Sequence, residues 1–189
     1  MPTDFAAQRQ VMVDTQVRPN DVPDLAIQEA MRAVPREAFC PADKLHLAYA
    51  DAEVDYAPGR ALMRPRDVAK LLQALHPKAD ERALAIAAPY AAGVLEAMGL
   101  AVERQDGELK AAPKGAFDVI VCEGAVAEPP AGWLKALAPG GRLAVVVRAG
   151  PVGRLRLYVR AAEDIGYRDV FDSAAPMLAG FEPEARFVF

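Results

Sequence analysis

Between residues 83 and 147, short runs of strand character alternate with segments of helical character. The last run ends the stretch L-A-P-G-G-R-L-A-V-V-V, in which a helix end, a glycine turn and a buried strand come one after another. Strands that alternate with helices form parallel sheets, so the pattern predicts an α/β fold with a mostly parallel sheet. The expected strands are Ala83–Ala87, Leu100–Glu103, Phe117–Val121 and Arg142–Val147, and the expected helices are Ala91–Met98 and Pro130–Leu137.

The C-terminal part of the chain has a different pattern. Residues Arg154–Arg160 read R-L-R-L-Y-V-R, with Leu155, Leu157 and Val159 on one face, which is the alternation of a half-buried strand. Two more strand candidates follow at Gly166–Asp172 and Ala185–Phe189. We therefore expect antiparallel strands to complete the sheet.

The N-terminal part is predicted to be mainly helical. A first helix begins after Thr3, which can cap it, and a second begins near Asp24. After a polar stretch, a third helix is expected over Pro65–Leu75, with proline in the first turn. The prediction is one domain over residues 1–189, with a helical cap at 1–78 and a sheet core at 79–189.

Composition fits one compact domain and excludes several function classes. Of the 189 residues, 53% are hydrophobic, which is enough for a sizeable core without metal or disulfide. The net charge of −4 gives no basic field for nucleic acid. Cys40 and Cys122 match no metal-ligand or redox spacing, so buried thiols are the simple interpretation, although Cys122 could instead be a reactive thiol at a strand end.

No targeting or membrane segment is expected. The N-terminus carries Asp4 and lacks an apolar signal region, which predicts a cytoplasmic protein. The run Ala83–Val102 is apolar except for Glu96 and approaches the length of a membrane span. Because Pro89, Gly93 and Gly99 interrupt it, a buried strand–helix–strand unit explains it better.

Several motifs occur in an order that resembles the protein-L-isoaspartate O-methyltransferase family, and they cover most of the chain. They are Arg9 to Val17, Ala30-Met31, V-P-R-E-A-F-C-P at Val34–Pro41, A-Y-A-D at Ala48–Asp51, G-R-A-L-M-R-P at Gly59–Pro65, F-D-V-I-V-C-E-G-A at Phe117–Ala125 and L-A-P-G-G-R-L at Leu137–Leu143. The resemblance implies a Rossmann-like class I methyltransferase fold that uses S-adenosylmethionine, without a metal, to esterify the carboxyl group of an isoaspartyl residue in a protein or peptide. Positioning would supply most of the acceleration in such a reaction. Residues 1–78 would then include the substrate side.

The cofactor turn departs from the family pattern. Where the family has roughly E-I-G-x-G-x-G-Y, this chain has A-I-A-A-P-Y. Ala85 replaces the acid, Ala87 and Ala88 stand in the glycine region, and Pro89 removes a backbone donor. Tyr90 matches the family's tyrosine after this turn or is an aromatic packed at a helix start.

Glu103 falls where the resemblance places an acid that hydrogen-bonds the cofactor ribose, and the alternative is an ordinary exposed strand-end glutamate. The interval between Glu103 and Asp118 is too short for the helix and edge strand that the family has there. We expect a fold reduced by about one helix and one edge strand. Pairing through the exposed edge would give a homodimer, whereas charged edge residues would prevent it.

The substrate side changes in the same direction. Met63 stands in place of the serine in the family's I-S-x-P motif, and a thioether cannot replace that hydroxyl donor. Arg60 and Arg64 could still attract a substrate carboxylate, or could be solvated surface residues. No residue is assigned a catalytic role.

Two functions follow. The first is a non-catalytic descendant that keeps the fold as a protein-binding module. The second is an active isoaspartyl methyltransferase that holds its cofactor by another route. An active enzyme needs an open, acid-rimmed pocket beyond Ala87 and Glu103, whereas a module can fill that space with side chains.

Overall fold

The computed structural model describes residues 4–183, and its centre is a six-stranded sheet with the order β4-β3-β5-β6-β7-β8. The first four strands are parallel, and β7 and β8 join antiparallel, so the predicted fold class is confirmed. The predicted strand at Ala185–Phe189 lies outside the described residues. The strands are β3 (Arg82–Ile86), β4 (Ala101–Gln105), β5 (Phe117–Val126), β6 (Leu137–Val147), β7 (Gly153–Ala161) and β8 (Asp164–Ser173).

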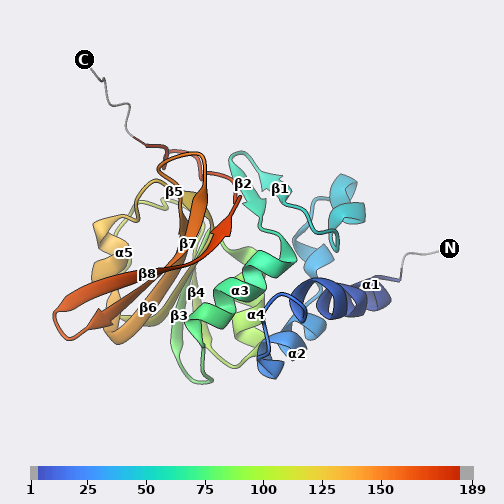
Figure 1. The fold of residues 1–189 in the computed structure, drawn as a ribbon, viewed down its shortest axis with the longest axis horizontal. Helices are drawn as coiled ribbons and strands as arrows, with labels where there is room; N and C mark the ends of the chain where they lie inside the picture. The colour runs from blue at the N-terminus through green and yellow to red at the C-terminus, as the bar shows by residue number, and fades with distance from the viewer. Residues whose placement is uncertain (1–3, 184–189) are drawn as a thin grey trace, which may run out of the picture.

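Helices cover the two faces of the sheet unequally (Figure 1). One face packs against α3 (Pro65–Leu75), α4 (Pro89–Ala97) and the N-terminal helices, and it contains the larger hydrophobic cluster. The other face packs against the short helix α5 (Ala131–Lys135) and the loop before β5, around Trp133 and Phe117. Helix α5 is shorter than predicted, because Leu137 already belongs to β6.

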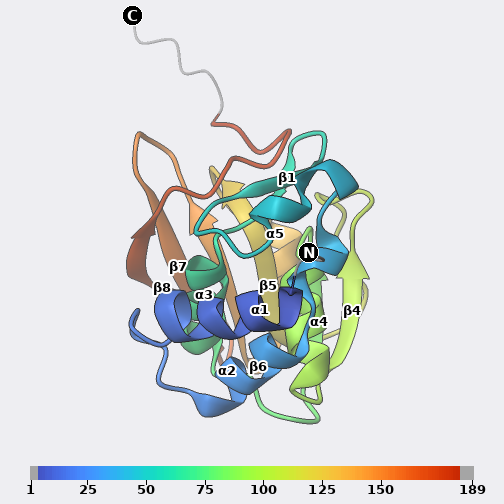
Figure 2. The ribbon, with the colours of Figure 1, turned by 90° about the vertical axis from the view of Figure 1, so that its right-hand side faces the viewer.

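The N-terminal cap consists of α1 (Phe5–Met12), which continues as the π-helix η1 (Val13–Val17), then α2 (Leu25–Ala33) and the 3-10 segments η2 (Arg36–Phe39) and η3 (Ala42–Leu47). Asp4, not Thr3, caps α1, since its carboxylate accepts a hydrogen bond from Ala7 N at 3.0 Å. Thr3 itself lies outside the described residues. Figure 2 looks onto α1 and α2, with β4 and β8 at opposite edges of the sheet.

The sequence analysis did not predict one element of the fold. A hairpin of β1 (Val54–Ala57) and β2 (Arg60–Leu62) stands where only a polar connection was predicted. Gly59 makes its turn possible with a φ of +66°, and the Cβ of Ala179 lies against it. This hairpin approaches the carboxyl ends of the parallel strands, where α/β folds bind ligands.

The expected shortening lies between β4 and β5. Residues 106–116 contain neither helix nor strand, so β4 forms the edge of the sheet (Figure 2). That edge carries two ion pairs, Arg82 with Glu103 and Arg104 with Glu96. Charged side chains of this kind protect a free edge against pairing, and the homodimer stays a prediction. None of the helices within residues 4–183 combines the length and apolarity that a membrane crossing requires.

Candidate functional site

The turn after β3 is short and closed. Only Ala87 and Ala88 connect Ile86 to Pro89, which starts α4. Ala87 has a φ of +46°, the left-handed conformation that favours glycine, and its amide donates to Gln105 O at 3.1 Å. The side chains of Ala87 and Ala88 are 0% and 1% exposed. The backbone therefore keeps a glycine-like conformation, but its methyl groups fill the space that glycine would leave open.

The β1–β2 hairpin lies over this turn. The Tyr56 hydroxyl donates to Ala87 O at 3.4 Å, and burial raises the pKa of this phenol to about 12. A tyrosine with a raised pKa stays a neutral donor at physiological pH. The turn is thus held from above by a side chain of the hairpin.

Glu123 is the most unusual residue at the strand ends. It lies within β5, its side chain is fully buried, and it reaches the N-terminus of α4. Its Oε1 accepts a hydrogen bond from Ala91 N at 2.7 Å, and its Oε2 accepts one from Met63 N at 3.3 Å. Burial raises the pKa of this carboxyl, while the backbone donors and the Arg36 guanidinium oppose that rise.

Arg36 is the buried cation of the same region. Its Nη2 donates to Met63 O at 2.7 Å and its Nε donates to Ala48 O at 2.9 Å. Met63 therefore joins Arg36, through its carbonyl, to Glu123, through its amide. This chain of contacts connects the N-terminal cap, the segment after β2, β5 and α4.

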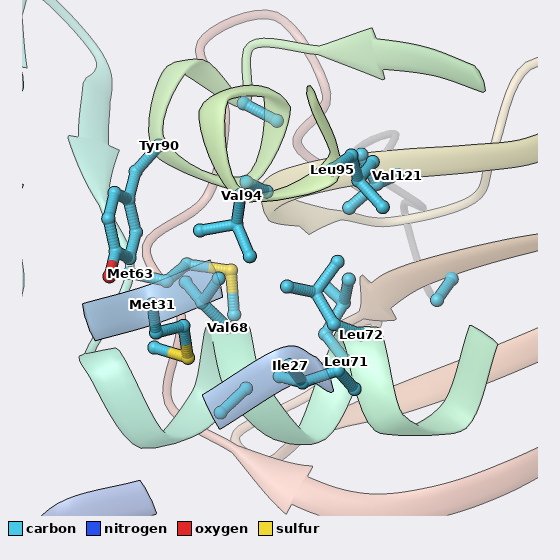
Figure 3. Close-up of a cluster of buried hydrophobic side chains, with 14 of the residues drawn as sticks. Ile27, Met31, Met63, Val68, Leu71, Leu72, Tyr90, Val94, Leu95 and Val121 are labelled. Carbon is cyan, nitrogen blue, oxygen red and sulfur yellow. The ribbon is translucent and has the colours of Figure 1, made fainter. Parts of the chain in front are cut away.

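Tyr90 packs inside this network. The Arg36 guanidinium lies 4.8 Å from the centre of its ring, and Phe39 meets the ring edge-on at 5.9 Å between centroids. Figure 3 shows Tyr90 next to Met63 and Met31 in the hydrophobic core. The Tyr90 hydroxyl is buried, has no hydrogen-bond partner within the described part of the chain, and has its pKa raised by burial. The cofactor role that the resemblance gives Tyr90 stays a prediction; the tyrosine itself packs at a helix start.

Glu103 lies away from the strand end. Strand β4 continues to Gln105, and Glu103 sits opposite Leu84 in the middle of the β3–β4 pair. Its Oε1 accepts hydrogen bonds from the guanidinium of Arg82, at 3.1 Å from Nε and 2.5 Å from Nη2. The predicted end of this strand was therefore two residues too early, and the cofactor role of Glu103 stays a prediction.

Gln105 holds the loop that follows β4. Its Nε2 lies at 2.9 Å from Glu108 O, 3.1 Å from Leu109 O and 3.0 Å from Ala111 O. Leu109 is buried, and its carbonyl also accepts a hydrogen bond from the Trp133 indole at 2.8 Å. The loop is thus folded onto the second face of the sheet, on the side where the family's additional helix and strand are missing.

The C-terminal segment closes the end of β5. Ala125 N donates to Pro176 O and Leu178 N donates to Ala125 O, both at 2.8 Å. The side chain of Leu178 packs against Gly124, where an added Cβ would approach it to 2.7 Å. The strand ends next to the closed turn are therefore covered by backbone and apolar side chains.

The residues predicted on the substrate side lie in three different environments. Arg64 precedes α3 and pairs with Glu53 at 2.8 Å. Met63 is fully buried, and its side chain points into the core (Figure 3). Arg60 lies on β2, where its Nη2 donates to Gly107 O at 3.4 Å. Of the two predicted arginines, Arg60 lines a cavity.

That cavity has a volume of about 480 Å³ and lies between the hairpin turn, the loop after β4 and the C-terminal segment. Arg60 and Lys110 supply cationic groups, Glu108 supplies an acid, and Leu109 and Phe181 supply apolar walls. A second cavity of about 710 Å³ shares Lys110 and Phe181 with it. Ala87, Ala88 and Glu103 line neither cavity.

The thiols and the acidic groups suggest no further centre. Cys122 is buried, and burial raises the pKa of its thiol, so the buried interpretation applies; Cys40 is half-buried. Within residues 4–183, His, Cys, Asp and Glu side chains form no group of three that could hold a metal ion.

Comparison with known proteins identifies relatives over nearly the whole chain. A protein-L-isoaspartate O-methyltransferase of Methylorubrum populi is 34% identical, covering 94% of this chain and 97% of the relative. This chain belongs to the protein-L-isoaspartate O-methyltransferase family. Similar proteins with that name in Methylorubrum extorquens and Rhodopseudomonas palustris are 32% and 31% identical. The alignment to the first spans 210 positions, more than the 189 residues present here, so it contains gaps in this chain. No protein-family model matches the chain.

Solved structures agree on the fold. A Plasmodium falciparum chain described as a protein-L-isoaspartate O-methyltransferase, in complex with S-adenosyl-L-homocysteine, aligns with a TM-score of 0.73 at 14% identity, covering 90% of this chain and 97% of that one. A second protein-L-isoaspartate O-methyltransferase structure also gives 0.73, at 16% identity, covering 93% of this chain and 67% of that one. The family resemblance seen in the sequence is confirmed.

Sequence reasoning missed the central role of two residues. Arg36 was part of the V-P-R-E-A-F-C-P motif, and no local signal marked it as a buried cation. Glu123 appeared only within the F-D-V-I-V-C-E-G-A motif, although a charged residue among apolar ones near a strand end is itself a signal. No local pattern indicated that Glu123 would reach α4.

Proposed function

We propose that this chain is a member of the protein-L-isoaspartate O-methyltransferase family in which S-adenosylmethionine binding and methyl transfer are weakened or lost, and which acts as a protein-binding module. The observation that carries the proposal is the closed turn after β3. Ala87 and Ala88 fill the glycine region, Tyr56 holds the turn from the hairpin, and the Glu123 carboxylate lies at the start of α4. A nucleotide cofactor needs close backbone approach at such a turn, which side chains of this kind oppose.

The loop after β4 supports the same proposal. Leu109 is buried against Trp133, and Gln105 holds the loop carbonyls in place. Those contacts occupy the side of the sheet where the family's extra helix and strand would complete a cofactor pocket. Rebuilding that side for a cofactor would require several buried groups to leave the core.

We assign the partner-binding surface to the cavity of about 480 Å³ beside the hairpin. Arg60 and Lys110 favour carboxylates of a partner protein, and Phe181 offers an apolar wall to its neighbouring side chains. This surface remains open, although the turn after β3 is closed. A module built on this fold can therefore bind a protein segment without a cofactor.

An active protein-L-isoaspartate O-methyltransferase is the second candidate. It is favoured by relatives of that name that match at 31–34% identity along most of the chain. In that case the turn must open, or the cofactor must enter by another route. The two candidates differ directly in cofactor affinity.

Isothermal titration with S-adenosyl-L-homocysteine tests the proposal. We expect no heat and no thermal shift at millimolar ligand, because a ligand that binds only the native state must raise its stability. The Methylorubrum populi relative, titrated under the same conditions, is the control for ligand quality. Micromolar binding would refute the loss of cofactor binding, and an isoaspartyl-peptide methylation assay would then measure the remaining activity.

A further inference from the structure

The N-terminus of α4 and the backbone of Met63, directly after β2, form a niche with two converging donors. Ala91 N and Met63 N belong to different segments, and both point at the carboxylate of Glu123. Glu123 lies 32 residues after the first donor and 60 after the second, so neither contact is local. The site is thus assembled by tertiary structure and not by helix capping within α4.

Two features of the niche favour negative charge and oppose the burial that raises the pKa of Glu123. A helix N-terminus carries a partial positive charge, and its free amides bind anions. Arg36 is fully buried and donates to the carbonyl of Met63, the residue whose amide binds Glu123. Its Nη1 has no hydrogen-bond partner within the described residues. Two donors and a buried cation therefore lie around one enclosed carboxylate.

We infer that this niche is a carboxylate-binding site whose permanent occupant is the protein's own Glu123 side chain. The side chain takes the position of a bound anionic ligand, and any external carboxylate must displace it. This inference concerns the niche alone. It holds whether or not S-adenosylmethionine binds elsewhere, so its failure would leave the proposed function untouched.

The inference predicts chemical rescue. Glu123→Ala removes four heavy atoms, Cγ, Cδ, Oε1 and Oε2, which correspond to those of acetate. The variant leaves the amides of Ala91 and Met63 without an acceptor, and it should unfold at a lower temperature than the wild type. Acetate should raise the melting temperature of this variant by about 3 °C or more in a saturable manner, and should leave the wild type unchanged.

Matched controls separate binding from general salt effects. Sodium chloride at equal ionic strength and neutral acetamide should give no comparable shift, since neither presents a planar carboxylate. Glu96→Ala, which removes an exposed carboxylate from the same helix, should not respond to acetate beyond the wild type. Equal shifts with acetate and chloride in Glu123→Ala would overturn the inference.

A second variant keeps the test decisive if Glu123→Ala does not fold. Glu123→Gln preserves the volume but turns an amide NH₂ toward one of the two backbone donors. It should melt well below the wild type and should not respond to acetate, because its side chain still fills the niche. A Glu123→Gln protein as stable as the wild type would show that the niche does not recognise a carboxylate.

Discussion

At the residue scale, Ala87 is the position in the closed turn where backbone strain and packing oppose each other. A β-carbon in the left-handed region costs about 1 kcal/mol or more, and here it is retained in a fully buried position. The methyl group also packs in the second hydrophobic cluster, and burying one methyl group is worth about 0.8 kcal/mol. Strain and packing are thus nearly equal and opposite at this position.

We therefore predict that Ala87→Gly leaves the free energy of unfolding within about 1 kcal/mol of the wild type. Ala85→Gly is the matched control, because Ala85 is equally buried in β3 but has no positive φ to relieve. It should lose about 1–2 kcal/mol. Urea unfolding of the two variants measures the difference, and an equal loss in both would contradict the strain at Ala87.

At the element scale, Gln105 is a main anchor of the loop at residues 106–116. The amide of Gln105 contacts three carbonyl groups of this loop. Gln105→Ala should therefore release the loop and lower the free energy of unfolding by about 1–2 kcal/mol. Hydrogen exchange should show faster exchange in residues 106–116 and no change in β7. Arg104→Ala, at the exposed neighbouring position of the same strand, should leave the loop protected.

A second link joins the end of α3 to the sheet. Arg142 of β6 donates to Leu75 O and His76 O, both at 2.6 Å, and it binds the Glu81 carboxylate at 2.8 Å. Burial alone would raise the pKa of Glu81, but the hydrogen bonds from Arg142 and Lys78 N outweigh it and leave the pKa below 4.5. The carboxylate of Glu81 is therefore stabilised in the folded state.

Glu81 makes the free energy of unfolding depend on pH. A carboxyl whose pKa is lower in the folded state adds stability above its unfolded pKa, and this is lost as the pH falls through the folded value. Glu81→Gln should cost about 1 kcal/mol at pH 7, and the difference from the wild type should shrink below about pH 4.5. Urea unfolding between pH 7 and pH 3 checks this. A difference that is constant with pH, or one shared by the exposed control Glu163→Gln, would contradict it.

At the scale of the whole molecule, the sequence predicted what local patterns determine. The apolar run of β5 and the proline at the start of α3 each depend on neighbouring residues, and each was found in place. The glycine turn expected before the last parallel strand lies instead within β6, which already begins at Leu137. The alanines that replace glycine indicated a changed turn, but left open whether it is open or closed. The hairpin β1–β2 was missed, because its strands have only four and three residues and its turn packs against the distant Ala179.

The buried network was beyond sequence reasoning for a physical reason. Glu123, Met63 and Arg36 meet only after β5, β2 and the N-terminal cap have assembled, and no periodic pattern records such a meeting. The same holds for Glu103, whose place in β4 is set by pairing with β3 and not by its own neighbours. Local chemistry thus predicted the elements, while the contents of the site depended on their packing.

One hydrophobic cluster contains Met12 and Ile27 of the cap together with Val119 and Val146 of the sheet, and the Arg36 network joins the same parts. We expect the cap and the sheet core to unfold in one transition. Trp133, the single tryptophan, lies on the opposite face of the sheet, so its fluorescence reports on the core while far-UV circular dichroism includes the cap helices. Coincident urea transitions are the expected result; a circular dichroism transition that precedes the fluorescence change would show that the cap unfolds independently.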